Sequence, residues 1–360
     1  MFPKFKSHCS NSNKLYFSPE LSVKKLYELY LEKEYKPKIG ITVFREQLKK
    51  YNISIYVPRK HTCAKCDQHR IMINNNLSEE QLKKAKDDHQ KHLIRAEDAR
   101  KELKEKGKEA QEPESKLLCF SFDFQKTQPI PYLNTSVAYY KRKLWLYNLG
   151  INTRNNNNGY MYLWDETNAK KGNNEVASSI LAFFQQIDLK IFEEIHTFSD
   201  CCGGQNRNKN IVSFFMYICE TTHIRTWTHT FLETGHSYLP NDTDFGKIEK
   251  MKRNTFGIYS VEQWAQMIKN CKFSVCQMKD KFFDISKLRK CLKFTGNDST
   301  GEKLKWHNLK WFETSKDTPY EIKFKYSNCT EETPKTIDLR KRKNSVSLQI
   351  FNWKRFTLNH

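Results

Sequence analysis

Apolar positions in the middle of the chain follow two different periods. Alternating or continuous apolar runs predict strands at about 118–124, 137–149, 160–164, 195–198 and 226–231. Helical spacing predicts helices at about 175–187, at 208–220 and from about Phe245 onward. An asparagine-rich turn at 155–158 makes the first three strands an antiparallel meander, and helices and strands then alternate. This order predicts a mixed α/β domain over residues 116–270, with the first and fourth strands adjacent in the sheet.

The segment before this domain mixes short helical patterns with Cys and His. Residues 1–75 contain two amphipathic stretches, about 21–30 and 42–51, and Ser18 is the expected N-cap of the first. A short strand is expected at 53–57, where Pro58 ends it. The region fits a small nucleic-acid-binding module, and structural packing is the alternative.

Residues 76–115 are almost entirely charged or polar, and Ser78 begins a capping-box pattern. Their apolar content is too thin for a buried helix, so we expect a solvated helical arm, with a dimerising coiled coil as the alternative. Residues 271–360 are basic, rich in aromatic residues and less regular. Within them Arg340–Lys343 is a basic cluster of the kind that serves nuclear import or phosphate contact.

The charge balance indicates a polyanionic partner. The 360 residues include 62 Lys and Arg against 41 Asp and Glu, a net charge of +21, and such repulsion opposes compaction unless a partner offsets it. DNA is the first candidate. No apolar run is long enough to span a membrane, and no secretion signal is expected. The 11 cysteines are then expected to be reduced thiols, which indicates the cytosol or the nucleus.

Three carboxylates have positions that suit metal-assisted phosphoryl chemistry. Asp123 lies inside a predicted strand, Asp200 ends the fourth strand, and the helix after the fifth strand offers Asp242, Asp244 or Glu249. Two Mg²⁺ or Mn²⁺ ions held by such oxygens neutralise a phosphodiester and activate its attacker. The alternatives are an exposed strand face for Asp123 and a helix N-cap for Asp242.

Polar residues near these carboxylates are candidates for contact with nucleic acid. Gly203 and Gly204 after Asp200 allow close approach of the backbone, and Asn206 and Arg207 follow at once. The basic residues of the second strand are further candidates for the DNA backbone: Lys141, Arg142 and Lys143. His236 is a candidate for orienting a carboxylate or bound water.

Four motifs in series resemble those of a group of transposon-derived proteins that have a ribonuclease H-like DDE transposase core. They are 122–129 (FDFQKTQP), 140–150 (YKRKLWLYNLG), 199–208 (SDCCGGQNRN) and 235–245 (GHSYLPNDTDF). The resemblance covers roughly residues 1–270. It implies a ribonuclease H-like fold, DNA cleavage and strand transfer, a homo-oligomer and a location in the nucleus.

The resemblance also selects among residues that position alone leaves open. It implies Asp242, with Phe245, as the third acid beside Asp123 and Asp200. A domesticated, inactive copy that still binds DNA and zinc is the alternative, because a resemblance does not show activity.

The front of the chain is similar to that group as well. Cys63 and Cys66 are spaced as half of a structural zinc site, and thiolates with imidazoles suit Zn²⁺. Cys9 with His8 or His69 could complete the four ligands. Two unligated thiols at a turn are the alternative.

Overall fold

The computed structural model describes residues 5–6, 15–17, 21–33, 37–55, 62–74, 78–133, 135, 141–329 and 331–341. The chain divides into two units, Met1–Thr62 and Cys63–His360, and each is described by itself. The boundaries expected near 75, 115 and 270 all fall inside the second unit.

The first unit contains two helices and a small sheet. Helix α1 covers Val23–Leu31 and α2 covers Ile41–Lys50, close to the expected ranges. Ser22, rather than Ser18, caps α1, because its Oγ accepts a hydrogen bond from the backbone N–H of Lys25 at 3.1 Å. The strands of this sheet are β1 (Phe5–Lys6), β2 (Leu15–Phe17) and β3 (Ile53–Ile55).

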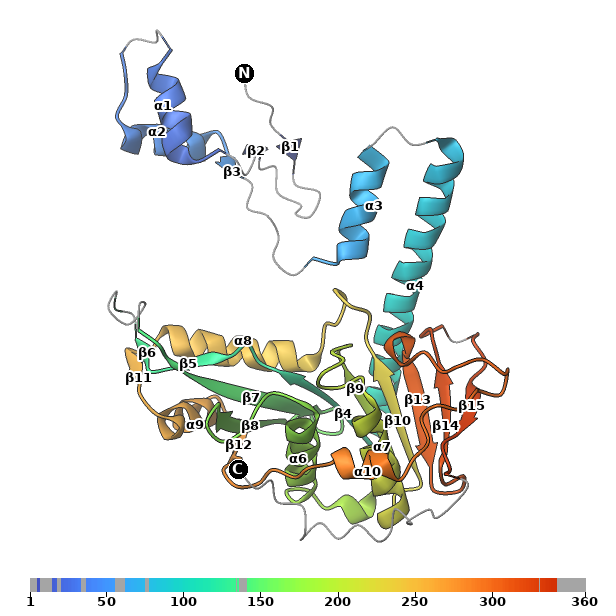
Figure 1. Ribbon diagram of the computed structural model, residues 1–360. Coiled ribbons are helices and arrows are strands. Elements are labelled where there is room, and N and C mark those ends of the chain that lie inside the picture. Colours follow the sequence, from blue (N-terminus) through green and yellow to red (C-terminus); the bar gives the residue numbers. More distant parts are fainter. Residues whose placement is uncertain are drawn as a thin grey trace. The chain divides into compact units, whose positions relative to one another are not determined.

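One mixed sheet organises the described part of the second unit (Figure 1). Its strand order is β12-β8-β7-β4-β9-β10-β13-β14-β15, and a short β5 also pairs with β7. The central strands are β4 (Leu117–Phe124), β7 (Leu144–Thr153), β8 (Gly159–Asp165), β9 (Glu194–Ser199) and β10 (Thr226–Phe231). The outer strands are β5 (Gln128–Ile130), β12 (Ser274–Gln277), β13 (Trp311–Ser315), β14 (Glu321–Lys325) and β15 (Lys335–Asp338). A separate pair joins β6 (Tyr132–Leu133) to β11 (Gly257–Ile258).

The pairing of the central strands follows the predicted order. β4, β7 and β8 form an antiparallel meander, and β9 and β10 are parallel to β4 and to each other. The fourth predicted strand therefore pairs with the first, as expected. One boundary was wrong: the second strand begins at Leu144, so Lys141–Lys143 precede it, and residues 136–140 lie outside the described part.

Helices cover both faces of this sheet (Figure 1). Buried apolar residues of α6 (Asn173–Phe184), α7 (Lys209–Thr221) and α10 (Ser286–Lys290) belong to the larger core cluster on one face. On the other face, α8 (Pro240–Arg253) and α9 (Val261–Asn270) pack around Leu146, Met161 and Leu163. The result is a three-layer α/β/α arrangement, so the coarse fold class predicted from the sequence is confirmed.

The charged arm is a helix that is only partly solvated. Helix α4 covers Glu79–Glu109, its capping box at Ser78 is formed as predicted, and α3 (Ala64–Asn74) lies beside it (Figure 1). The expectation of a solvated helix was wrong for its second half. One face of that half is buried, and its residues are His92, Ala96, Ala99, Leu103 and Gly107. Small side chains let the helix approach β4 closely, so little apolar volume suffices.

The basic C-terminal region is more regular than expected, because β13, β14 and β15 extend the same sheet beyond β10. Residues 342–360 lie outside the described part, and with them the second half of the basic cluster at Arg340–Lys343. In the part of the chain that is described, no helix has the length and apolar character needed to cross a membrane.

Candidate functional site

Asp123 and Asp200 lie on neighbouring strands at the same edge of the sheet. β4 and β9 are parallel, and the last pair of their ladder is Ser121 with Phe198. Each aspartate comes two residues after that pair. The Asp123 carboxylate is half-buried, and one of its oxygens accepts a hydrogen bond from the backbone N–H of Phe124 at 2.8 Å. The parallel register therefore brings the two carboxylates together from positions 77 residues apart.

The first turn of α8 brings Asp242 to the same edge. The helix begins at Pro240, earlier than expected, so Asp242 lies inside it. The neighbouring Asn241 is fully buried: it accepts a hydrogen bond from the Ser121 hydroxyl at 2.6 Å and donates one to the Gly150 carbonyl at 2.9 Å. Because Gly150 pairs with Asp123, these bonds hold the start of α8 over the first aspartate.

The three acids interact electrostatically. The pKa of Asp123 is raised to about 7, chiefly by burial and then by the charge of Asp200, with a smaller contribution from Asp242. The half-buried ammonium group of Lys171 opposes this increase. In turn, burial lowers the pKa of Lys171, while Asp123 and Asp200 raise it. Such a cluster binds protons or cations in order to relieve the repulsion between its carboxylates.

Sequence reasoning missed Lys171. It is one of 62 basic residues and stands in a loop before α6, where neither spacing nor a motif distinguishes it from Lys170. Only the folded chain brings it to the carboxylates, where its ammonium group lies 4.7 Å from the ring centre of Phe124.

The loop after Asp200 is built to hold that carboxylate. Asn206 is buried and donates a hydrogen bond to an oxygen of Asp200 at 2.6 Å, and the backbone N–H of Cys202 donates to the same oxygen at 3.1 Å. Asn206 thus positions Asp200 and does not face solvent as a DNA contact would. Asn208 caps α7 by accepting two backbone hydrogen bonds, and Arg207 remains half-buried between them.

All three candidate acids of α8 have hydrogen-bond partners, and Asp242 accepts from the backbone N–H of Leu239 at 3.0 Å. Asp244 accepts a hydrogen bond from Lys247 at 3.2 Å. Glu249 forms an ion pair with Lys252 and accepts hydrogen bonds from two glutamine side chains. Asp242 is the acid of α8 whose charge acts on Asp123.

A second cluster of chemically active residues gathers where α3, α4 and the loop between β10 and α8 meet. The donor atoms of Cys63, Cys66, His92 and His236 all lie within 4.8 Å of one another. The Sγ of Cys63 is 3.1 Å from Nε2 of His92, and the Sγ of Cys66 is 3.3 Å from Nε2 of His236. Burial lowers the pKa of both histidines, so their imidazoles are neutral near pH 7.

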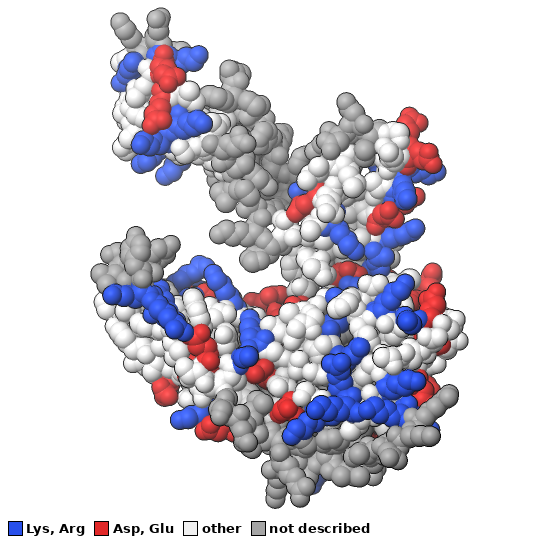
Figure 2. All heavy atoms as spheres, in the orientation of Figure 1, with Lys and Arg blue, Asp and Glu red and all other residues white. Residues whose placement is uncertain are grey.

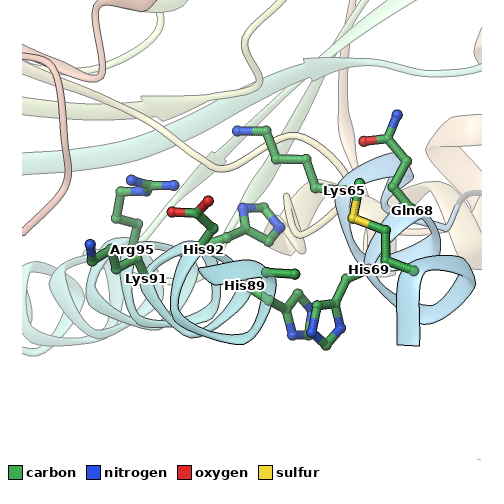
Figure 3. Close-up of a pocket in the computed structure, with 10 residues that line it drawn as sticks. Lys65, Gln68, His69, His89, Lys91, His92 and Arg95 are labelled. Atoms are coloured by element: carbon green, nitrogen blue, oxygen red, sulfur yellow. The ribbon is translucent and has the colours of Figure 1, made fainter. Parts of the chain in front are cut away.

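This arrangement changes two predictions, and a third lies outside the described residues. His236 belongs to the Cys/His cluster, so its expected role at the aspartates was wrong. His69 does not complete the set. Its ring stacks on that of His89, with 3.9 Å between the ring centroids. Both rings line a cavity of about 340 Å³ between α3 and α4 (Figure 3). His8 and Cys9 lie outside the described residues.

A basic cavity of about 490 Å³ is lined by Cys63 and His92 of the Cys/His cluster and by Arg207 of the loop after Asp200. Its lining includes Lys65, Arg95, Arg207 and Lys310, together with the single acid Glu233. Figure 2 shows Lys and Arg spread over much of this face of the molecule. Lys141, Arg142 and Lys143 lie at another place, just before β7, where Arg142 is 3.8 Å from Glu166. The cavity near Arg207 was not foreseen, because its lining residues come from six separate segments of the chain.

The fold and the two clusters define a mixed α/β protein with a carboxylate site at one sheet edge and a Cys/His site beside it. The chain belongs to the family described as Domain of unknown function (DUF7869), whose profile matches residues 141–330, more than half of its length. That range contains Asp200, Asp242 and His236 and begins after Asp123. No curated protein and no solved structure matches the chain.

Proposed function

We propose that residues 116–270 form a ribonuclease H-like core that cleaves DNA and transfers its strands, with Asp123, Asp200 and Asp242 as the acids that bind the catalytic metals. The observation that carries this proposal is the grouping of the three acids, in which burial first and then the charges of Asp200 and Asp242 raise the pKa of Asp123 to about 7. The order of elements supports it as well: an antiparallel meander, then helices alternating with two strands parallel to the first.

The donor set fits Mg²⁺ or Mn²⁺. Hard divalent ions prefer carboxylate oxygens, and three carboxylates that interact electrostatically, with Lys171 as the nearby cation, retain negative charge for such ions to neutralise. When bound there, two ions supply charge neutralisation at the phosphodiester and lower the pKa of the attacking water or hydroxyl.

The chain's own residues would then orient the reacting groups. Asn206 and the Cys202 N–H hold one oxygen of Asp200, which leaves its other oxygen for a ligand. Gly204 has no atom within 4 Å of the position a Cβ would take, so DNA can approach the backbone of this loop. Lys171 would lie near the phosphate that reacts.

In the cleavage step, a water oxygen bonds to phosphorus and the bond from phosphorus to the 3′ oxygen breaks. The water gives up a proton and the departing 3′ oxygen takes one. In the transfer step, the freed 3′-hydroxyl attacks a phosphodiester of a second DNA and displaces that DNA's own 3′ oxygen.

The basic cavity supports a DNA substrate. Arg207 belongs to the loop after Asp200, and the Lys310 ammonium group lies 3.5 Å from the Sγ of the neighbouring Cys201. Basic residues therefore extend from this loop into the cavity. Phosphate contacts of this kind give affinity without sequence preference. A DNA substrate in turn agrees with a location in the nucleus and with assembly of several copies on two DNA ends.

Direct measurement of Mn²⁺ binding tests the site without knowledge of the DNA sequence. Titration followed by electron paramagnetic resonance should detect Mn²⁺ bound to the wild-type chain and to the Asp244→Asn variant. We expect binding at least about a hundredfold weaker in the Asp242→Asn variant, equivalent to about 2.7 kcal/mol. Asp244 is a matched control because it lies on the same helix and pairs with Lys247.

Cleavage of labelled duplex DNA tests the reaction itself. We expect Mn²⁺-dependent cutting by the wild type and by Asp244→Asn, and none by Asp200→Asn, although all three bind DNA. If Mn²⁺ binds and the wild type holds DNA without cutting or joining it, the inactive DNA-binding alternative is correct. Equal Mn²⁺ affinity in all variants would refute the carboxylate site.

A further inference from the structure

Four potential metal ligands come from three segments that are far apart in the sequence. Cys63 and Cys66 stand at the start of α3, His92 lies on α4, and His236 lies in the loop before α8. A tetrahedral ion with bonds of about 2.0–2.3 Å separates its ligand atoms by roughly 3.3–3.8 Å. The two shortest sulfur–nitrogen distances, 3.1 and 3.3 Å, are close to that spacing. Four such donors leave no open position, which is typical of structural zinc.

The surroundings of His92 provide a second, independent observation. The side chain is 3% exposed, and its Nδ1 is buried with no hydrogen-bond partner among the described residues. The carboxylate of Glu233 lies 4.0 Å from this nitrogen. A histidine that binds zinc through Nε2 carries its proton on Nδ1 and commonly directs it to a carboxylate. The buried Glu233 is placed for that role, and Lys310 at 3.1 Å offsets its charge.

The loop that carries His236 depends on a glycine. Gly235 has φ of +81°, and a Cβ built there would lie 2.5 Å from the Cα of Cys63. Any other residue would push the loop away from the cysteines. The backbone is therefore adapted to bring His236 against the CxxC segment.

We propose that Cys63, Cys66, His92 and His236 bind one structural Zn²⁺ that joins the α3–α4 hairpin to the loop preceding α8. This set replaces the ligands His8 and Cys9 expected from the sequence. The site stands independently of the proposed nuclease function. Zinc holds the loop that ends at α8, and so keeps the first turn of that helix in place.

Metal analysis of the purified full-length chain tests the ligand set. We expect about one zinc per chain in the wild type and in Cys329→Ser, and little in Cys66→Ser. Cys329 is a matched control because it is also half-buried and lies outside the cluster. With Co²⁺ in place of zinc, the wild type should show thiolate-to-cobalt charge-transfer bands and the visible bands of tetrahedral Co²⁺. Equal zinc content in the two variants, or a cobalt spectrum without thiolate bands, would overturn the proposal.

The isosteric Glu233→Gln variant preserves all four ligands, so it tests the site even if Cys66→Ser fails to fold. Loss of a carboxylate that orients a ligating histidine commonly weakens metal binding about 10–100-fold. Competition with a chelator of known affinity should show this change, and an unchanged zinc affinity would remove Glu233 from the site.

Hydrogen exchange tests the link to α8. Amides of residues 232–242 should exchange at least about tenfold faster in Cys66→Ser than in Cys329→Ser, because opening of the loop costs less free energy without the metal. Amides of β4 and β9 report whether the sheet remains folded. Unchanged exchange at 232–242 in a zinc-free, folded variant would show that the metal does not hold this loop. Neither readout involves DNA cleavage, so failure here is distinct from failure of the proposed function.

Discussion

The Asp123 carboxylate has a pKa of about 7 because burial and two neighbouring acids disfavour its charge. Because this pKa is higher in the folded than in the unfolded state, the free energy of unfolding falls as the pH rises. The loss is absent below the unfolded pKa of 3.8 and complete above about 7. At the scale of single residues, we therefore expect the Asp123 carboxylate to make the stability of the metal-free protein depend on pH.

Asp123→Asn should raise the free energy of unfolding above pH 7 in buffer free of Mg²⁺ and Mn²⁺. The whole shift corresponds to about 4 kcal/mol, and partial solvent exposure reduces the expected gain to roughly 1–2 kcal/mol. Urea unfolding at several pH values measures it. The gain should grow between the unfolded pKa of 3.8 and about pH 7 and stay constant above. A gain independent of pH would contradict this origin.

Lys171 provides a second prediction at this scale. In Lys171→Met, loss of the nearby positive charge should raise the pKa of Asp123 further, so the rise of the cleavage rate with pH should move to higher pH. We expect about a 10–100-fold lower rate at neutral pH. Lys170→Met is the control, because Lys170 is the exposed neighbour. Equal pH profiles for the two variants would exclude Lys171 from the site.

At the scale of elements, the position of α8 depends on close packing against β7. A Cβ at Gly150 of β7 would lie 2.7 Å from the ring of Phe245, so only glycine allows the helix to lie this near the sheet. The same contact explains why Gly150, at the end of one motif, accompanies Phe245, three residues after Asp242.

Gly150→Ala should therefore move α8 away from β4 and β7. We expect about 1–3 kcal/mol lower stability, together with weaker Mn²⁺ binding because Asp242 moves with the helix. Gly246→Ala on the same helix is the control: its Cβ meets open space, so stability should rise by about 0.5–1 kcal/mol. Thermal or urea unfolding distinguishes the two; a stable Gly150→Ala variant would show that the helix is free to shift.

The pattern of apolar positions was sufficient for the central strands of the second unit and for the helices between them. Alternation identified the five central strands, and a capping box identified the start of α4. It was insufficient for α4's burial, because a stripe of alanines and a glycine carries little hydrophobic signal. It also missed β13–β15, since strands of four or five residues with polar outer faces resemble irregular chain.

At the scale of the whole molecule, the net charge of +21 should make DNA binding strongly dependent on salt. Arg207 lines the basic cavity next to Asp200, whereas Lys116 precedes β4 at the opposite end of the strand from Asp123.

Arg207→Ala should reduce the slope of log affinity against log salt by about 0.9, the value for one lost phosphate contact. Lys116→Ala removes the same charge and should leave the slope unchanged. Fluorescence anisotropy with one labelled duplex at several salt concentrations measures both. Equal slopes for the two variants would place the DNA elsewhere on the surface.

The sequence alone was enough to predict a mixed α/β sheet, its central strand order, a polyanionic partner and the three candidate aspartates. Local periodicity and turn residues carry that information, because each depends on neighbours a few positions away. The tertiary structure alone decided which residues join Cys63 and Cys66, and that Lys171 lies beside Asp123. Those groupings bring together segments up to 173 residues apart, and only the packing of helices on the sheet determines such contacts.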